Sequence, residues 1–402
     1  MAISRLMISA AALLLACVGF VKAQNPPPGW KGKITIENGV RKVLNPALPL
    51  YGEVNLELEE ELRIGDEKDD RAAFYDLVRF ALDSAGCIYI MDAGNSRIQK
   101  FDGKGNFLLS FGRKGQGPGE FRQLSDIYVD GRDHVLVYES LGVYASLHDF
   151  DGEGAFVRTH KYRFPNVPGV GPKFIQPSVF LAQGSSDLEG RKRELFLLTV
   201  EGERLKTVAD YPLSPPPPVV KKRMLGNPFE SRLFHGAFSS GGGIYGHSSA
   251  YRLFTLDKEG NVVAAIEKDA KPVAVTKKDR ERLIEDFLLR QEKLSFSWVE
   301  KLTREEVRRA YIFSDTVPYF EGIFVDDRDR IYVRRWKRYS PTDPSETFDV
   351  FDRNGFFLWV VKFPRYPALL KDGRLYAIQR DPESGYSTFL RYRIKNWDAL
   401  RR

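Results

Sequence analysis

The chain has 402 residues, of which 43% are hydrophobic and 13% aromatic, so it can bury a large core. The formal net charge of +7 permits attraction to anionic surfaces without requiring it. Because Cys17 and Cys87 are the only cysteines, a disulfide framework is excluded once the N-terminal segment is removed. Cys87 lies in an apolar stretch, and we expect it to be packed rather than reactive.

Residues 1–23 have the pattern of a signal peptide. Arg5 precedes an uncharged run over residues 6–21 that is too short for a good transmembrane helix. Ordinary signal peptidase would cut after Ala23, whereas the tetrapeptide that ends at Cys17 resembles a lipobox, in which Cys17 would be lipidated. We therefore expect a secreted or periplasmic protein, or alternatively a lipoprotein whose only membrane contact is an anchor at Cys17.

Residues 24–50 are rich in Pro, Gly and Asn and are predicted to form a leader segment. From residue 51 onward two short patterns recur. The first occurs at Phe101–Phe107, Phe150–Phe156, Phe351–Phe357 and Leu256–Val262. The second occurs at Leu82–Tyr89, Val129–Leu136 and Val325–Tyr332, with looser copies at Ser240–Tyr245 and Lys371–Tyr376. Each copy contains turn-forming residues between apolar strands, and two such hairpins make a four-stranded antiparallel propeller blade.

Residues 92–102, Phe107, Phe111 and the sequence GQGPGEF at 115–121 resemble an NHL repeat. The whole chain resembles bacterial secreted or lipoprotein six-bladed β-propellers of this type. The resemblance is strong over residues 77–160, fair over 233–268 and 317–363, and weak over 174–212 and 365–395. It implies an all-β fold, a six-bladed β-propeller over residues 51–402.

Counting the repeats predicts innermost strands that begin near residues 77, 124, 174, 233, 317 and 365. The sixth unit ends before its outer strand. Ile64 and Phe74 have the same spacing as Phe111 and Phe121, which predicts that Val54–Ile64 supplies this missing strand. An N-terminal strand would then close the ring by pairing with the C-terminal strands, and closure removes exposed sheet edges.

The connections between strands differ in length. If the strands of a blade are called a to d from the axis outward, the a–b and c–d turns are short. The b–c and d–a connections are long and emerge together on the other face, so we predict that this face binds the ligand. A helical insertion at about residues 275–313 has apolar residues at Leu283, Ile284, Phe287 and Leu288, and a capping-box pattern that starts at Thr303. Its helices would either form a lid over the axial opening or pack on blades four and five.

Two sets of residues are candidates for ligand binding. Alignment of the inner strands places one set at the axial channel, namely Arg79, Asp126, His235, Glu321 and, by a looser match, Tyr366. These residues would bind a small polar ligand or form an internal salt-bridge network. The second set is basic and aromatic, lies on the long-loop face and comprises Arg191, Lys192, Arg193, Arg334, Arg335, Trp336, Lys337 and Arg338. These residues would attract an anionic partner or form a solvated charged rim.

No catalytic residue, metal site or cofactor is predicted. The five histidines do not recur at one blade position, and Asp126 and Glu321 alone are too few for a calcium centre. We expect a binding or scaffold propeller, monomeric, with an unknown protein, peptide or glycan partner and no nucleic acid. The alternative is a hydrolase or lyase with a polar site at the axial channel.

Overall fold

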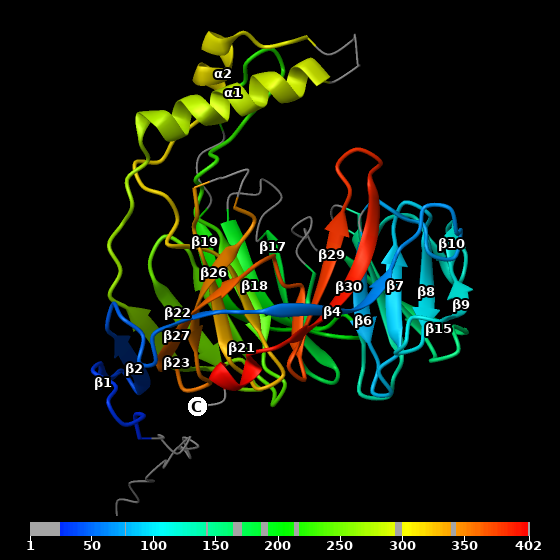
Figure 1. Ribbon diagram of the computed structural model, residues 1–402, viewed down its shortest axis with the longest axis horizontal. Helices are drawn as coiled ribbons and strands as arrows, with labels where there is room; N and C mark the ends of the chain where they lie inside the picture. The colour runs from blue at the N-terminus through cyan, green and yellow to red at the C-terminus, as the bar shows by residue number, and fades with distance from the viewer. Residues whose placement is uncertain are drawn as a thin grey trace, which may run out of the picture.

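A computed structural model describes residues 25–76, 78–141, 144–163, 171–185, 192–212, 217–293, 300–338 and 343–400. Six sheets, each with a four-stranded antiparallel core, form a β-propeller (Figure 1), which confirms the predicted fold class. The predicted signal peptide, including Cys17, and Arg191 of the basic set lie outside the described residues.

The first three blades each contain four consecutive strands. Blade one contains β6 (Val78–Leu82), β7 (Ile88–Asp92), β8 (Arg97–Phe101) and β9 (Phe107–Phe111). Blade two contains β12 (Leu124–Val129), β13 (Val135–Leu141), β14 (Tyr144–Phe150) and β15 (Phe156–Arg163). Blade three contains β16 (Lys173–Gln176), β17 (Val179–Ser185), β18 (Lys192–Thr199) and β19 (Arg204–Pro212).

The other three blades also recruit N-terminal strands. Blade four contains β20 (Leu233–Ala237), β21 (Gly243–His247), β22 (Arg252–Leu256) and β23 (Val262–Lys268), followed outward by β2 (Val40–Asn45) and β1 (Lys33–Glu37). Blade five contains β24 (Phe320–Val325), β25 (Ile331–Arg335), β26 (Glu346–Phe351), β27 (Phe357–Phe363) and β3 (Glu53–Asn55). Blade six contains β28 (Leu369–Lys371), β29 (Arg374–Arg380), β30 (Tyr386–Ile394) and β4 (Leu58–Ile64).

The repeated aspartates build the short turns. The carboxylate of Asp102 accepts the backbone N–H groups of Lys104 and Asn106, both at 2.8 Å. Gly105 then adopts a φ of 88°, which a residue with a side chain rarely adopts. Asp151 in blade two and Asp352 in blade five accept the equivalent backbone N–H groups of their own turns, two and four residues further along the chain. The turn chemistry therefore fixes the position at which each outer strand starts.

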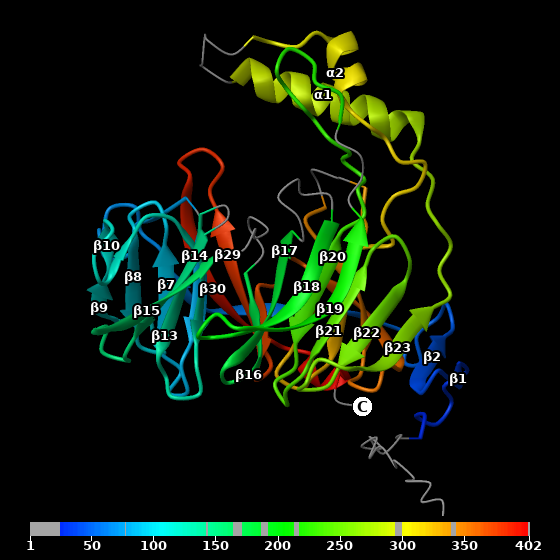
Figure 2. The ribbon, with the colours of Figure 1, turned by 180° about the vertical axis from the view of Figure 1, so that it is seen from behind.

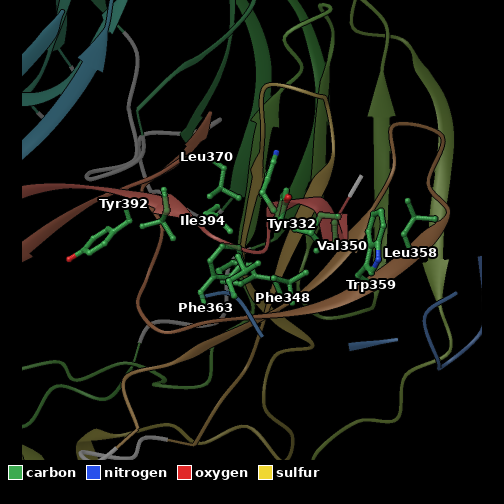
Figure 3. Close-up of a cluster of buried hydrophobic side chains, with 14 of the residues drawn as sticks. Tyr332, Phe348, Val350, Leu358, Trp359, Phe363, Leu370, Tyr392 and Ile394 are labelled. Carbon is green, nitrogen blue, oxygen red and sulfur yellow. The ribbon is translucent and has the colours of Figure 1, made fainter. Parts of the chain in front are cut away.

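Apolar side chains pack between adjacent blades. Figure 3 shows the cluster in which side chains of blade five, such as Tyr332 and Phe363, lie near Leu370 and Ile394 of blade six. Trp397 and Leu400 of the short C-terminal 3-10 helix, Trp397–Leu400, join the same cluster. Burial of such rings is worth about 1.5–3 kcal/mol per side chain, and this stabilises a protein in which no disulfide links the blades.

The N-terminal strand closes the ring. β4 pairs antiparallel with β30, and Phe74, like Phe121, is fully buried, as the matched spacing predicted. The predicted strand Val54–Ile64 is in fact divided. Residues Glu53–Asn55 form β3, which pairs in parallel with β27 of blade five, and the closing strand starts only at Leu58.

The remainder of the N-terminal region is also part of the sheet structure. Strands β1 and β2, which lie within the predicted leader segment, form a hairpin, and β2 pairs in parallel with β23 of blade four. Two short strand pairings lie in the connections around blade one, where β5 (Phe74–Tyr75) pairs with β30 and β10 (Arg113–Lys114) pairs with β11 (Glu120–Phe121).

The helical insertion stands away from the propeller. Helices α1 (Lys277–Lys293) and α2 (Arg304–Ala310) lie beyond the strand ends, on the side to which the β29–β30 hairpin projects (Figures 1 and 2). Thr303 and Glu306 make the predicted capping box, because each side chain accepts the other's backbone N–H. Within the described residues, neither helix combines the length and apolar composition needed to cross a bilayer.

Candidate functional site

The long connections lie on one side of the disc. The β29–β30 hairpin, which is a b–c connection, and the helical insertion, which belongs to a d–a connection, project in the same direction (Figure 2). We call this side the loop-rich face, and the side of the short Asp turns the turn face. The inner strands β12, β16, β20 and β24 each carry or adjoin polar side chains, which define the candidate site.

Asp126 of β12 is the centre of a polar cluster that we call the axial cluster. Its Oδ2 atom accepts a 2.8 Å hydrogen bond from the Tyr128 hydroxyl and lies 3.7 Å from Nζ of Lys173. The Lys173 ammonium also lies 5.7 Å from the centre of the Tyr128 ring. Burial, and then the charge of Asp126, raise the pKa of Tyr128 well above its ordinary value, so this hydroxyl remains a hydrogen-bond donor. Lys173 remains 43% exposed and can therefore reach a ligand.

The loop segment at Gly171, which leads into β16, closely approaches Asp126. A Cβ atom at Gly171 would lie 2.0 Å from Asp126 Oδ2 and 2.3 Å from the Tyr128 hydroxyl. Only a residue without a side chain fits there while the backbone keeps its position. Gly171 therefore allows this loop to approach the axial cluster.

His235 of β20 lies deeper, between blades three and four. Its Nδ1 atom is 2.8 Å from Nε2 of Gln183, which also donates to the Leu233 carbonyl. With Gln183 as the donor, Nδ1 is the acceptor and the imidazole proton is on Nε2. This Nε2 atom is buried without a well-formed hydrogen bond among the described residues, although the Leu181 carbonyl lies nearby. Burial, and then the charge of Lys173, lower the pKa of His235 to about 3, so the ring is neutral at neutral pH.

Glu321 and Tyr366 belong to a second group on blades five and six. Arg334 links them, because its guanidinium lies 3.6 Å from the Glu321 carboxylate and 5.1 Å from the centre of the Tyr366 ring. Burial raises the pKa of Glu321. Tyr366 is 51% exposed, so its ring offers a surface on which a ligand could stack.

The five predicted axial residues have different bonding partners. Among the described residues, no hydrogen bond or ion pair joins any two of Arg79, Asp126, His235, Glu321 and Tyr366. Arg79 donates to the neighbouring Val78 carbonyl, and its charge acts on Tyr128. The residues that the alignment missed are Lys173, Tyr128 and Gln183. Lys173 is the first residue of the inner strand of blade three, and this position was the only signal in the sequence that it could line the axis.

The basic set is largely engaged in ion pairs. Each cation between positions 334 and 338 lies within 4 Å of a carboxylate, in the pairs Arg334–Glu321, Arg335–Asp349, Lys337–Asp343 and Arg338–Asp279. Lys192 lies 3.6 Å from Asp210. Arg193 is partly buried, and this burial lowers its pKa. Trp336 packs against Phe229, with the ring centres 6.3 Å apart. Most of this set is therefore paired within the protein, mainly between neighbouring strands.

The Arg338–Asp279 pair connects the helical insertion to blade five. Arg338 follows β25, and Asp279 lies in the first turn of α1, where the Arg338 guanidinium holds the pKa of the carboxyl well below its usual value. Ile284, Phe287 and Leu288 of α1 pack with Leu302, Val307 and Val220, and not on the propeller strands. The insertion is thus a small arm with its own apolar core.

A hollow of about 410 Å³ lies between blades two and three. It is lined by Leu136, Pro177 and Val200, with Arg132 and Arg158 among the polar lining residues. At the position equivalent to Leu136, blades one and five carry Tyr89 and Tyr332, whose hydroxyls donate to the turn residues Asp83 and Asp326. The shorter side chain of Leu136 leaves this space open. Because Asp130 and Gly131 of a short turn also line it, the hollow belongs to the turn face.

No metal centre is evident in the described part of the chain. There, no three His, Cys, Asp or Glu side chains are grouped so that they could hold a metal ion. His134 and His148 instead bind the carboxylates of Asp149 and Glu139 at 2.7 and 2.9 Å, within blade two.

Comparisons with known proteins concern the architecture. The profile of the DUF5128 family, described as a 6-bladed beta-propeller, matches residues 76–167, which include all strands of blades one and two. No curated protein sequence matches the chain significantly.

Several solved structures are similar to the whole chain at low sequence identity. A candidate exported protein of Bacteroides fragilis is 13% identical, with a TM-score of 0.48, and the match covers 88% of this chain and 99% of that one. A DUF4221 member from Bacteroides vulgatus is 12% identical, with a TM-score of 0.48 and coverage of 85% and 98%. Virginiamycin B lyase from Staphylococcus aureus is 10% identical, with a TM-score of 0.38 and coverage of 83% and 99%. The family profile and the strand order agree on a six-bladed β-propeller, and the profile match spans blades one and two.

Proposed function

We propose that this protein is an extracytoplasmic binding propeller that presents its loop-rich face to a polar or anionic ligand or to a protein partner. The observation that carries the proposal is the asymmetry of the two faces. The long connections and the helical arm lie on one side, whereas the opposite side consists of short turns. Rigid scaffolds commonly carry their binding residues on such loops.

The axial cluster supports a polar ligand. Lys173 supplies a cation, the Tyr128 hydroxyl, whose proton is donated to Asp126, can accept a hydrogen bond, and the Arg334–Tyr366 pair supplies an exposed stacking surface. Among the described residues, no hydrogen bond or ion pair joins the axial cluster to the group of Glu321, Arg334 and Tyr366, so we propose binding and no catalytic step, which would require convergent groups.

We also propose that the repeats are of the NHL type and that the protein is exported. The pattern over residues 92–121 supports the first point, and the basic, apolar and small-residue sequence of residues 1–23 supports the second. Mass spectrometry of the mature protein would distinguish the two export routes. A chain that starts at Gln24 indicates secretion, and a lipidated Cys17 at the N-terminus indicates an anchor.

A pull-down with matched face variants tests the binding proposal. The bait is the chain from residue 24 onward, incubated with the envelope fraction of the source organism. The loop-face variant combines Lys173→Glu in the axial cluster with Arg380→Glu at the β29–β30 hairpin. The turn-face variant combines Lys104→Glu with Lys258→Glu and makes the same change in net charge.

We expect a specific partner to remain with the turn-face variant and to fall at least tenfold with the loop-face variant, because a lost charge contact is worth about 1.5–3 kcal/mol. A partner that is lost only with the turn-face variant would overturn the assignment of the binding face.

A further inference from the structure

The helical arm contains a groove of about 310 Å³ that the axial site does not use. It lies between α1 and the segment at residues 223–225, with Tyr311 at the end of α2. Phe287, Leu225 and Tyr311 supply the apolar lining, whereas Arg223, Arg290 and Gln291 supply the polar lining. Met224 also lines the groove and is 60% exposed, so the apolar surface continues to the rim. We call this feature the arm groove.

The two arginines of the arm groove differ from the arm cations that form ion pairs. Four arm cations are paired with carboxylates, in Lys221–Glu300, Arg280–Asp315, Arg304–Glu285 and Arg308–Glu281. Arg223 instead lies over the Phe287 ring at 5.4 Å and donates to Gln291, and Arg290 donates to the backbone carbonyl of Asp286. Within the described residues, neither guanidinium has a carboxylate partner.

The neighbouring sequence does not supply such a partner. Residues 213–216 and 294–299, which adjoin the described parts of the arm, contain no Asp or Glu. Asp286 is the carboxylate whose charge acts on Tyr311, and it lies one helical turn before Arg290 without forming an ion pair with it. The groove therefore combines an apolar floor with two guanidinium groups that can still receive an anion.

Arg223 is held in place by a strained turn. Val220 and Arg223 exchange two backbone hydrogen bonds of 2.9 Å, and the two residues between them, Lys221 and Lys222, have φ values of 47° and 62°. Two-residue turns of this kind favour Asn and Gly, because lysine is disfavoured at positive φ. Salt bridges of Lys221 to Glu300 and Glu306, at 2.9 and 3.0 Å, hold the turn in this conformation. Backbone strain that is maintained in this way often accompanies a binding function.

We propose that the arm groove docks an acidic segment of a protein partner. A large apolar side chain of the segment would pack on Phe287 and Tyr311, and flanking carboxylates would pair with Arg223 and Arg290. Charge complementarity favours an acidic segment, and the volume of the groove suits one large side chain. This inference rests on the proposed binding function and names a partner class for one part of the loop-rich face.

Fluorescence anisotropy with a synthetic peptide tests the inference directly. The probe is a labelled nonapeptide with one central Phe between four Glu residues on each side, titrated with the chain from residue 24 onward at low salt. We expect saturable binding that weakens at least tenfold in Arg223→Glu and in Arg290→Glu. Lys278→Glu makes the same charge change on α1 outside the groove and should bind within twofold of the wild type.

Two further peptides distinguish the groove from general charge attraction. Replacement of Phe by Gly should weaken binding at least tenfold, and replacement of all Glu by Lys should abolish it. Equal binding of the Phe and Gly peptides would overturn the proposal, because a polyanion of any class would then satisfy the site. Unchanged binding by both arginine variants would overturn it as well. Arg290 is exposed, so Arg290→Glu should melt at the temperature of Lys278→Glu, which shows that the arm remains folded.

The result of the peptide titration can be distinguished from that of the pull-down with the face variants. If no peptide binds to the wild type, while the envelope pull-down retains a partner that depends on Lys173 and Arg380, the groove proposal is wrong and the binding propeller stands.

Discussion

A network of buried charges lies between blades four and five. The carboxylate of Asp349 is fully buried and binds Lys268 at 2.6 Å, Arg335 at 2.6 Å and the Tyr251 hydroxyl at 2.5 Å. Burial lowers the pKa of Lys268, while the charge of Asp349 opposes that shift. This arrangement is stable only while the positive and the negative charges are both present, because each ion provides the electrostatic stabilisation that water gave the other before burial.

The first prediction concerns Asp349→Asn. The variant leaves Lys268 and Arg335 without their counter-ion, so we expect the free energy of unfolding to fall by about 3–5 kcal/mol. Urea denaturation followed by circular dichroism measures this change. Glu59→Gln removes one partner of an exposed pair with Arg393 and should leave the denaturation midpoint nearly unchanged. If both variants unfold at the same urea concentration, the buried network is not important for stability.

The second prediction concerns the pH dependence due to His235. The unfolded chain takes up a proton at this histidine near its ordinary pKa of 6.5, whereas the folded protein excludes it until about pH 3. The unfolded state therefore binds more protons between these values, and stability falls as the pH falls through this window. At about 1.4 kcal/mol per pH unit below 6.5, the expected loss between pH 7 and pH 5 is about 2 kcal/mol.

Replacement of His235 by Asn should remove this loss while an acceptor for Gln183 is kept. The measurement is the unfolding free energy of both proteins at pH 7 and pH 5. An equal decrease in the two proteins would mean that other groups cause the acid sensitivity.

At the scale of elements, local turn chemistry explains how much of the fold could be predicted. Asp102, Asp151 and Asp352 bond their own turns within four residues, so the sequence itself reveals the hairpins. Blade three lacks this aspartate at the turn after Thr199, and the resemblance is weak there. The spacing of the other blades nevertheless predicted that its inner strand begins near residue 174, and this strand starts at Lys173.

Long-range pairing explains what could not be predicted. Asp279 and Arg338 are 59 residues apart, and Asp349 and Lys268 are 81 residues apart. A cluster of cations such as residues 334–338 does not show in the sequence whether its counter-ions are nearby, so the predicted basic surface could not be distinguished from a set of internal pairs. In the same way, alignment identified the inner-strand position of His235 but not Gln183, which binds its ring.

The third prediction concerns the hollow between blades two and three. Leu136→Tyr introduces the residue that blades one and five carry at this position, and the new ring would enter the hollow and reach Asp130. We expect the unfolding free energy to rise by about 1 kcal/mol, as is common when a cavity is filled. Leu147→Tyr makes the same change at a fully buried position of the same blade that does not line the hollow, and should destabilise by about 1–3 kcal/mol. Similar destabilisation by both variants would show that Arg132 and Arg158 already fill the space.

At the scale of the whole molecule, the ring depends on strands from both ends of the chain. Blade six is assembled from β28, β29 and β30, which come from the C-terminal region, and from β4, which lies more than 300 residues earlier. β3 and β2 are added to the outer edges of blades five and four. The N-terminal strands therefore serve two purposes: β4 completes a blade, whereas β1, β2 and β3 cover the edges of blades that already have four strands.

The fourth prediction separates these two purposes by truncation. A chain that starts at residue 47 lacks β1 and β2 but keeps β4, and we expect it to unfold cooperatively at a reduced midpoint, because the buried Val43 is lost. A chain that starts at residue 65 also lacks β4 and its buried Ile64, so the nine-residue strand β30 becomes an unpaired edge. Such edges pair with other chains, so this variant should lose cooperative unfolding and aggregate. Thermal denaturation and analytical ultracentrifugation measure the two properties, and a monomeric, cooperatively melting chain that starts at residue 65 would show that β4 does not close the ring.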